Sequence, residues 1–245
     1  MKRIKIVVQY LGTNYAGWQV QPNHRTIQGE IQSAIKNGLC EDAEVFGSGR
    51  TDAGVHAFMQ TAHFDTCSKI RSDKIYSVLN RFLPEDIKIL SSEEVSNTFH
   101  ARFDVKQKTY EYHFYSSEVT LPLFDQTHAK IPYPFDFDKV VLASKAFLGT
   151  HDFVGFSSSG SPRKDTLRTI FSISVFKNID GTFCFSVTGN GFLYNMVRII
   201  AGTLIEVGLG KIKPEDLPDI INSKQRNRAG KTAPARGLVL KEVVY

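Results

Sequence analysis

The chain has 245 residues, of which 42% are hydrophobic, and carries a formal net charge of +5. It is long enough to bury one large core or two small ones, and its positive charge favours a polyanionic partner such as nucleic acid. Its three widely separated cysteines match no metal-binding spacing, no signal-like segment is evident, and no apolar run is long enough for a bilayer, so we expect a cytoplasmic protein with reduced thiols and no membrane association.

The first part of the chain alternates between strand and helix patterns. Residues 3–10 alternate in polarity, which is typical of a strand with one more polar face. Thr26 is a suitable N-cap for a helix with isoleucines on one face, ending at Gly38. The further elements expected here are strands at residues 44–46, 58–64 and 86–90 and a helix at residues 72–82, ahead of Pro84.

The second part repeats this order of elements without detectable sequence identity to the first. It predicts strands at residues 105–115, 169–176, 182–188 and 237–245 and helices at residues 138–148 and 193–207, with a short helix from Pro214. The fold class is therefore α+β, built from two ferredoxin-like (RRM-like) halves, each β-α-β-β-α-β, at residues 1–104 and 105–245. We expect the halves to share one mostly antiparallel sheet with helices on one side.

A glycine-rich segment at residues 47–57, GSGRTDAGVHA, is called the glycine loop below. It lacks the Lys-Ser/Thr ending of a phosphate-binding loop. A loop aspartate such as Asp52 usually caps a turn, but the glycines permit close approach of a ligand, and predicted strands flank the loop as a rigid mount. A metal site through Asp52 and His56 lacks an evident third ligand. We therefore favour Asp52 as a covalent nucleophile.

Basic residues gather in two further segments. Residues 157–168 include Arg163, Lys164 and Arg168, and residues 224–236, called the basic segment below, contain five basic residues and no acidic one. A single charge run is usually a solvated surface. On a basic chain with RNA-binding-like halves, contacts with phosphate groups are an equally good interpretation.

The glycine loop carries a resemblance to a known family. GRTDAGVHA (residues 49–57) resembles the signature of the tRNA pseudouridine synthase A family, and YAGWQVQPNHRTIQ, FHARFDVKQKTYEYHFY and NGFLYNMVRIIAGTLIEVG are similar to its other blocks, in the family's order. The resemblance covers nearly the whole chain. Met59 and Arg81 stand where the family often has smaller residues, which concerns packing rather than chemistry.

This resemblance implies a role for several residues. Asp52 matches the catalytic aspartate that attacks the target uridine, and Arg50 matches the arginine that supports extrusion of the base. Tyr110 matches the tyrosine that stacks on the base, and Arg198 matches the basic residue paired with the catalytic carboxylate. The reaction is an isomerisation, so it needs no cofactor or metal.

The residues themselves agree with these roles. Tyr110 alternates with Tyr112 and Phe114, which we assign to the core, and a phenol at the start of the strand could be half exposed for stacking. Arg198 lies among apolar residues of its helix, where an arginine either extends to solvent or pairs with a buried carboxylate; pairing with Asp52 would keep that carboxyl ionised. His100 and Arg102 are suggested as tRNA contacts, although a structural turn is as good an interpretation of His100.

The resemblance also implies the substrate and the assembly. It indicates uridines on the 3′ side of the anticodon stem-loop (tRNA positions 38–40) and a homodimer with the tRNA lying across both subunits. Two alternatives stay open: a non-catalytic RNA-binding module on the same fold, and a metal-dependent nuclease or phosphatase. The second needs a carboxylate cluster, and none is evident beside Asp52.

Overall fold

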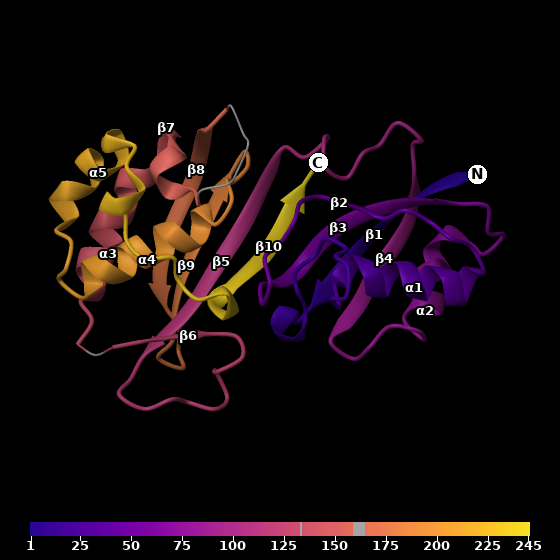
Figure 1. Ribbon diagram of the computed structural model, residues 1–245, viewed down its shortest axis with the longest axis horizontal. Helices are drawn as coiled ribbons and strands as arrows, with labels where there is room; N and C mark the ends of the chain where they lie inside the picture. The colour runs from indigo at the N-terminus through magenta and orange to yellow at the C-terminus, as the bar shows by residue number, and fades with distance from the viewer. Residues whose placement is uncertain (133, 159–164) are drawn as a thin grey trace. The chain divides into compact units, whose positions relative to one another are not determined.

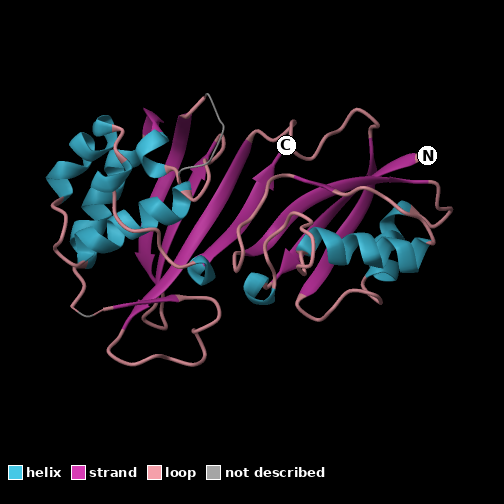
Figure 2. Cartoon of the chain, viewed as in Figure 1, coloured by secondary structure: helices cyan, strands magenta, loops and turns pink. Residues whose placement is uncertain are grey.

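A computed structural model describes residues 1–132, 134–158 and 165–245. The chain divides into two compact units (Figure 1). Unit 1 comprises Met1–Lys106 together with Leu240–Tyr245, and unit 2 comprises Gln107–Val239. Each unit combines helices with a mostly antiparallel sheet, which confirms the predicted α+β class (Figure 2).

Unit 1 has the predicted β-α-β-β-α-β order. Its elements are β1 (Lys2–Tyr10), α1 (Ile27–Leu39), β2 (Phe46–Gly47), β3 (His56–Thr66), α2 (Ile75–Leu79) and β4 (Ile87–Val95). Strand β1 pairs with both β3 and β4 in antiparallel register, and β2 pairs with β3. The C-terminal strand β10 (Leu238–Val244) follows β3 in the strand order and ends in this unit.

The core of unit 1 follows from two periodicities. Ile4 and Ile6, two residues apart on β1, are fully buried, as a strand with one covered face requires. Ile31 and Ile35, four residues apart on α1, are also fully buried. Helices α1 and α2 lie on one face of this sheet (Figure 1). Thr26 caps α1 as predicted, its side chain accepting a hydrogen bond from Gly29 N at 3.3 Å.

Two helix boundaries in unit 1 differ from the sequence prediction. Helix α1 continues past Gly38 and is closed by Cys40 in the left-handed conformation (φ 57°). Gly38 instead allows close packing, because a Cβ there would lie 3.2 Å from the Phe82 ring. The helix predicted at residues 72–82 is a 3₁₀ turn, Ser72–Lys74, followed by the short α2. Just after α2, the Asn80 side chain donates to Ile89 O and accepts from Ile89 N, both at 2.8 Å, and so bonds to β4.

Unit 2 has the elements predicted for residues 105–223, with two added strands, whereas most of the strand predicted at residues 237–245 belongs to unit 1. They are β5 (Gln107–Ser116), β6 (Ala129–Ile131), α3 (Phe137–Ser144), β7 (Gly149–Asp152), β8 (Leu167–Lys177), β9 (Phe183–Gly189), α4 (Met196–Gly208) and α5 (Leu217–Ser223). The strand order is β5-β9-β8-β7, and β6 pairs with β5 in parallel. Strands β6 and β7 were not predicted because three or four residues are too few to show alternation.

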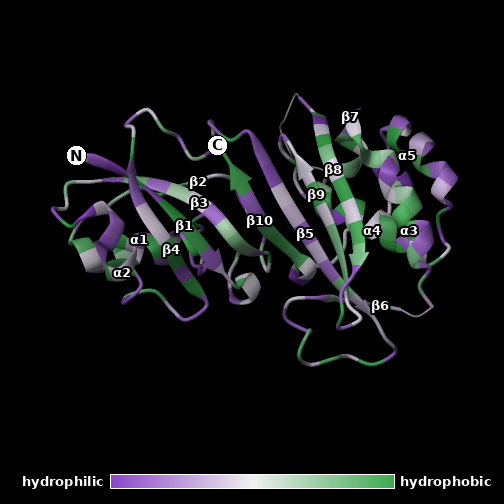
Figure 3. Ribbon diagram, turned by 180° about the vertical axis from the view of Figure 1, so that it is seen from behind, coloured by the Kyte–Doolittle hydropathy of each residue, from purple (hydrophilic) through white to green (hydrophobic). Residues whose placement is uncertain are grey.

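Helix α4 organises the core of unit 2. Ile199 and Ile200 on this helix are fully buried, and Tyr112 and Phe114 of β5 are 0% and 2% exposed, which confirms their assignment to the core. A Cβ at Gly202 would lie 1.7 Å from Lys231 O, so only glycine lets the basic segment cross the helix this closely. Hydrophobic and hydrophilic residues are interspersed along the strands of both units (Figure 3). Among the described residues, no helix is long and apolar enough to cross a membrane.

Candidate active site

The glycine loop is fixed by tight backbone packing in unit 1. Trp18 N donates a hydrogen bond to Thr51 O at 3.0 Å. Gly17 has a left-handed backbone (φ 96°), and a Cβ there would lie 2.5 Å from the same carbonyl oxygen. The Trp18 ring packs against Gly47, where a Cβ would lie 2.6 Å from it, and Trp18 is 2% exposed, as expected for a core residue. The backbone on either side of Asp52 therefore has little freedom.

Buried polar side chains support the same loop. Tyr10 Oη and Thr51 Oγ1 lie 2.9 Å apart, and Ser48 Oγ donates to Gln60 Oε1 at 2.5 Å. The amide of Gln60 in turn donates to Gly49 O at 3.0 Å. Burial raises the pKa of the Tyr10 phenol, so it stays neutral and available for hydrogen bonding. These groups satisfy the polar atoms of the loop, which a buried loop requires.

Asp52 begins a turn and its side chain is half-buried. Val55 N donates to Asp52 O at 3.1 Å, with Gly54 left-handed (φ 77°) inside the turn. His56 Nδ1 accepts a hydrogen bond from Gly12 N at 2.9 Å, so His56 has a structural contact beside the loop. Arg50 is exposed, and its Nε donates to Gln19 Oε1 at 3.2 Å. The loop thus presents a half-buried carboxylate and an exposed guanidinium two residues apart.

Tyr110 and Arg198 belong to unit 2. Tyr110 lies on β5 opposite Val187, and its ring meets Phe192 edge-on with centroids 5.2 Å apart. It is 9% exposed, less than the half-exposed phenol suggested by its place on the strand. Arg198 on α4 donates from Nε to Ala233 O at 2.9 Å and from a terminal nitrogen to Asn195 Oδ1 at 2.8 Å. Its guanidinium therefore has a defined orientation within its own unit.

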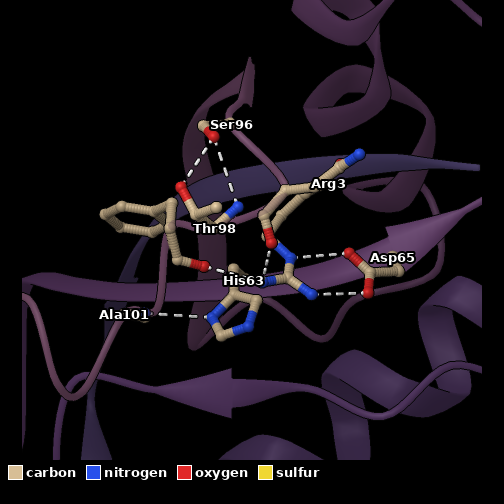
Figure 4. A network of polar contacts seen from close by, with 8 residues as sticks. Arg3, His63, Asp65, Ser96, Thr98 and Ala101 are labelled. Atoms are coloured by element: carbon tan, nitrogen blue, oxygen red, sulfur yellow. Dashed lines mark hydrogen bonds and ion pairs between the residues drawn. The ribbon is translucent and has the colours of Figure 1, made fainter.

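The loop that holds His100 and Arg102 is anchored from below. Arg3 forms a bidentate pair with Asp65 at 2.8 Å and donates to Phe99 O, while His63 Nδ1 accepts from Ala101 N at 3.1 Å (Figure 4). Burial, then the positive charges of Arg3 and His100, lower the pKa of His63 to about 4. His63 is therefore neutral at pH 7, and its ring serves as a hydrogen-bond acceptor on β3.

The outer surface of this loop is aromatic and basic. Phe103 is 74% exposed, and the His100 ring stacks on it with centroids 4.2 Å apart. The exposed Arg102 guanidinium lies 5.7 Å from the centre of the same ring. His100 also accepts a hydrogen bond from Arg102 N at its Nδ1, so it contributes to the turn as well as to the surface.

The other basic residues have a different arrangement. Arg163 and Lys164 lie outside the described residues. Arg168 donates to the carbonyl of Leu167 and lies 3.7 Å from a carboxylate oxygen of Asp165. In the basic segment, the described contacts join Lys224 to Asp152 at 2.8 Å, Arg226 to Gly230 O at 2.9 Å and Arg236 to Asp125 at 2.7 Å. These side chains fold the segment onto unit 2.

The supporting residues of the glycine loop were not identified from the sequence. Tyr10 lies in a strand pattern, Gln60 in another, and Gly17 in a separate block of the chain. The one available signal was Gly17 itself, because a glycine between Ala16 and Trp18 suggests a close backbone approach. What it approaches is decided by the pairing of segments distant in sequence.

A carboxylate presented by a rigid loop, beside an exposed arginine on a basic α+β chain, is compatible with an enzyme that uses an aspartate in catalysis. The family model for tRNA pseudouridine synthase matches residues 6–104 and 143–245, and the chain belongs to this family. Members of the family are isomerases that act on uridines of tRNA.

Full-length relatives agree with this assignment. The chain is 50% identical to tRNA pseudouridine synthase A 2 of Clostridium tetani, covering 100% of this chain and 99% of the relative. It is 47% identical to tRNA pseudouridine synthase A of Acetivibrio thermocellus, covering 100% of both chains. A crystal structure of a Cbf5-Nop10-Gar1 complex is similar at 13% identity with a TM-score of 0.36, covering 96% of this chain and 57% of that chain.

Proposed function

We propose that this protein isomerises uridine to pseudouridine on the 3′ side of the tRNA anticodon stem-loop, with Asp52 as the nucleophile. The observation that carries the proposal is the rigid glycine loop that presents Asp52, within the region matched to the family. The names of the relatives, tRNA pseudouridine synthase A, support tRNA as the substrate.

The reaction conserves atoms and electrons. Asp52 attacks the target uridine, the bond between the ribose C1′ and N1 of the base breaks, the uracil turns, and C1′ bonds to C5. The proton leaves C5 and N1 gains one, and Asp52 is released unchanged. No oxidant, reductant or cofactor is required, and every step needs the base out of its stack. We assign to Arg50, which is exposed two residues from Asp52, the role of filling the vacated space.

We assign the remaining roles to residues of unit 2. Tyr110 stacks on the extruded uracil and receives the C5 proton, and Arg198 keeps Asp52 ionised by supplying an opposite charge. The fixed orientation of the Arg198 guanidinium supports this role, because a planar fork held by two acceptors loses little freedom when it meets a carboxylate.

Recognition of the tRNA depends on shape and phosphate, since an A-form helix offers few readable base edges. Arg102 and His100 are the best supported contacts, because Arg102 is exposed beside the open Phe103 ring. A cation next to an exposed aromatic ring suits a phosphate and an unstacked base together. We also include Arg163, Lys164 and Arg168 as RNA contacts, on their charge alone. We also propose that the protein is cytoplasmic and forms a homodimer.

The decisive experiment maps pseudouridine in unmodified tRNA transcripts incubated with the pure protein and without added metal. We expect product at the 3′ side of the anticodon stem-loop. Asp52→Asn removes charge at nearly constant shape, so product formation falls by more than about 10⁴-fold while tRNA affinity is retained. Ala53→Ser, at the next and exposed position, is the matched control and stays active.

Two results would contradict the proposal. Wild-type protein that binds tRNA without forming pseudouridine would favour the non-catalytic RNA-binding module. An Asp52→Asn variant as active as wild type would show that another group is the nucleophile. Sedimentation of the free protein and of its tRNA complex tests the homodimer.

A further inference from the structure

Three potential metal ligands meet on the sheet of unit 2, in residues that the proposed reaction does not use. Glu111 and His113 lie two residues apart on β5, so both point to the same face of the sheet. Cys184 on β9 is paired with His113 across the antiparallel ladder and therefore shares that face. The ligand atoms of the three side chains all lie within 4.8 Å of one another. This set is called the Glu-His-Cys cluster.

The cluster is withdrawn from solvent. Cys184 is 1% exposed, and the side chains of His113 and Glu111 are 19% and 13% exposed. His113 Nε2 is buried and forms no hydrogen bond within the part of the chain that the structure describes, although it lies 3.2 Å from Glu111 Oε2. A buried ring nitrogen that faces a carboxylate without a hydrogen bond costs free energy unless something else contacts it.

We propose that the Glu-His-Cys cluster binds a zinc-type divalent cation. Zinc takes thiolate, imidazole and carboxylate ligands at about 2.0–2.3 Å, which places the ligand atoms of a tetrahedral site about 3.4–3.6 Å apart. The carboxylate and imidazole are already at 3.2 Å, and rotation about the side-chain bonds closes the remaining gap. The sulfur selects against Mg²⁺ and Ca²⁺, which prefer oxygen ligands.

A fourth candidate ligand lies next to the cluster. The ring of His128, from the segment that follows β5, has its centroid 5.3 Å from that of His113. The fourth ligand is this imidazole or a water molecule. A bound cation would fasten the middle of β5 to β9 and stabilise unit 2, since a ligand that binds only the folded state raises its stability. This role does not depend on the proposed isomerase activity.

Cobalt titration provides the test, because a cysteine-ligated Co²⁺ gives a thiolate-to-metal charge-transfer band. Cys40 and Cys67 are exposed, so the experiment uses the full chain with Cys40→Ser and Cys67→Ser, in which Cys184 is the remaining thiol. We expect one Co²⁺ per chain, a charge-transfer band, and displacement by an equivalent of Zn²⁺. Zn²⁺ in about hundredfold excess over its Kd should raise the Tm by roughly 5–10 °C.

Variants locate the site. In the same background, Cys184→Ser should remove the charge-transfer band, and Glu111→Gln should keep it while weakening zinc binding by at least about tenfold, since even outer partners of a metal change affinity that much. His151→Gln, a half-buried histidine elsewhere in unit 2, is the matched control and should leave the titration unchanged. A missing charge-transfer band in the Cys184-containing protein, or an unaltered titration in Cys184→Ser, would overturn the proposal. The first of these outcomes is measured on protein in which Glu111, His113 and Cys184 are all intact. It therefore contradicts the proposal even if a variant fails to fold.

Discussion

The glycine loop of unit 1 and the basic segment of unit 2 are both irregular and polar, yet different groups hold them in place. The glycine loop is held by its backbone and by buried neighbours such as Trp18 and Gln60. Its position therefore does not depend on the charged side chains that it presents. In the basic segment, Lys224, Arg226 and Arg236 hold the structure through their own charged groups.

The role of a charged segment therefore depends on whether its charged side chains hold it in place. A catalytic side chain needs a mount that does not depend on it, so that its charge can act on the substrate. A basic side chain that already satisfies carbonyl and carboxylate oxygens in its own unit gives up those contacts before it can bind phosphate. Charge density in the sequence therefore identifies neither a catalytic loop nor an RNA-binding surface.

Among the variants that test this comparison, the largest effect is expected at Arg198, which contacts the basic segment at Ala233 O. Arg198→Met should lower the rate of pseudouridine formation by about 10²–10³-fold, a typical loss for one electrostatic contact at a reacting centre. Arg198→Lys keeps the charge without the planar fork and should retain part of the activity. Single-turnover rates measure both. If Arg198→Met has the wild-type rate, the arginine only braces unit 2, like its neighbours in the basic segment.

The second effect tests the mount of the glycine loop. Gly17→Ala adds a Cβ 2.5 Å from Thr51 O at a left-handed position (φ 96°). We therefore expect the free energy of unfolding to fall by about 2–4 kcal/mol and the activity to be lost. Gly181→Ala is the matched control, because its backbone is also left-handed (φ 82°) but a Cβ there meets nothing within 4 Å. Thermal unfolding should show only the strain of about 1–2 kcal/mol for this control. Equal losses in the two variants would mean that the loop tolerates displacement.

The third effect tests the brace of the basic segment. Arg226→Gln removes charged hydrogen bonds to Gly230 O and Thr232 Oγ1, and should destabilise the protein by about 1.5–3 kcal/mol. Arg228→Gln, an exposed neighbour, should cost less than about 0.5 kcal/mol. Neither should alter the salt dependence of tRNA binding, whereas Arg102→Gln should reduce its slope by about one. A smaller slope of log affinity against log salt concentration for Arg226→Gln would show that the basic segment contacts the tRNA.

The smallest effect is the loss of stability in acid that comes from the Asp152–Lys224 ion pair. The ion pair with Lys224, then the hydrogen bond from Thr166, lowers the pKa of Asp152 below its usual range. A carboxyl whose pKa is lower in the folded state adds stability above its unfolded pKa near 4, and this stability is lost as the pH falls through the folded value. Asp152→Asn should therefore flatten the loss of stability below about pH 4 by less than 1 kcal/mol. Denaturant unfolding at pH 7 and pH 3 measures the difference, with the exposed Asp216→Asn as control.

Local sequence patterns predicted much of the fold. The β-α-β-β-α-β order of unit 1, the Thr26 cap and the buried isoleucines of β1 and α1 follow from periods of two and 3.6 residues, which are visible within ten residues of chain. The short β6 and β7 escaped because they are too brief for a period. The early end of α2 was not predicted, because the Asn80 side chain that follows it bonds to Ile89 on the later strand β4.

For the candidate site, the sequence alone indicated the residues suited to the proposed chemistry: Asp52 and Arg50 in one glycine-rich loop, with an arginine, Arg198, in an otherwise apolar helix. The contacts that hold these residues in place are visible only in the tertiary structure. Gly17 and Gln60 support the loop from other segments. Arg226 donates a hydrogen bond to the backbone of the basic segment at Gly230 O. The tertiary structure also brought Cys184 against Glu111 and His113, although 71 residues separate Cys184 from His113 in the chain. The reason is physical: residue type and local spacing fix what a side chain can do, while its partners depend on strand register and packing between distant segments, which no local pattern contains.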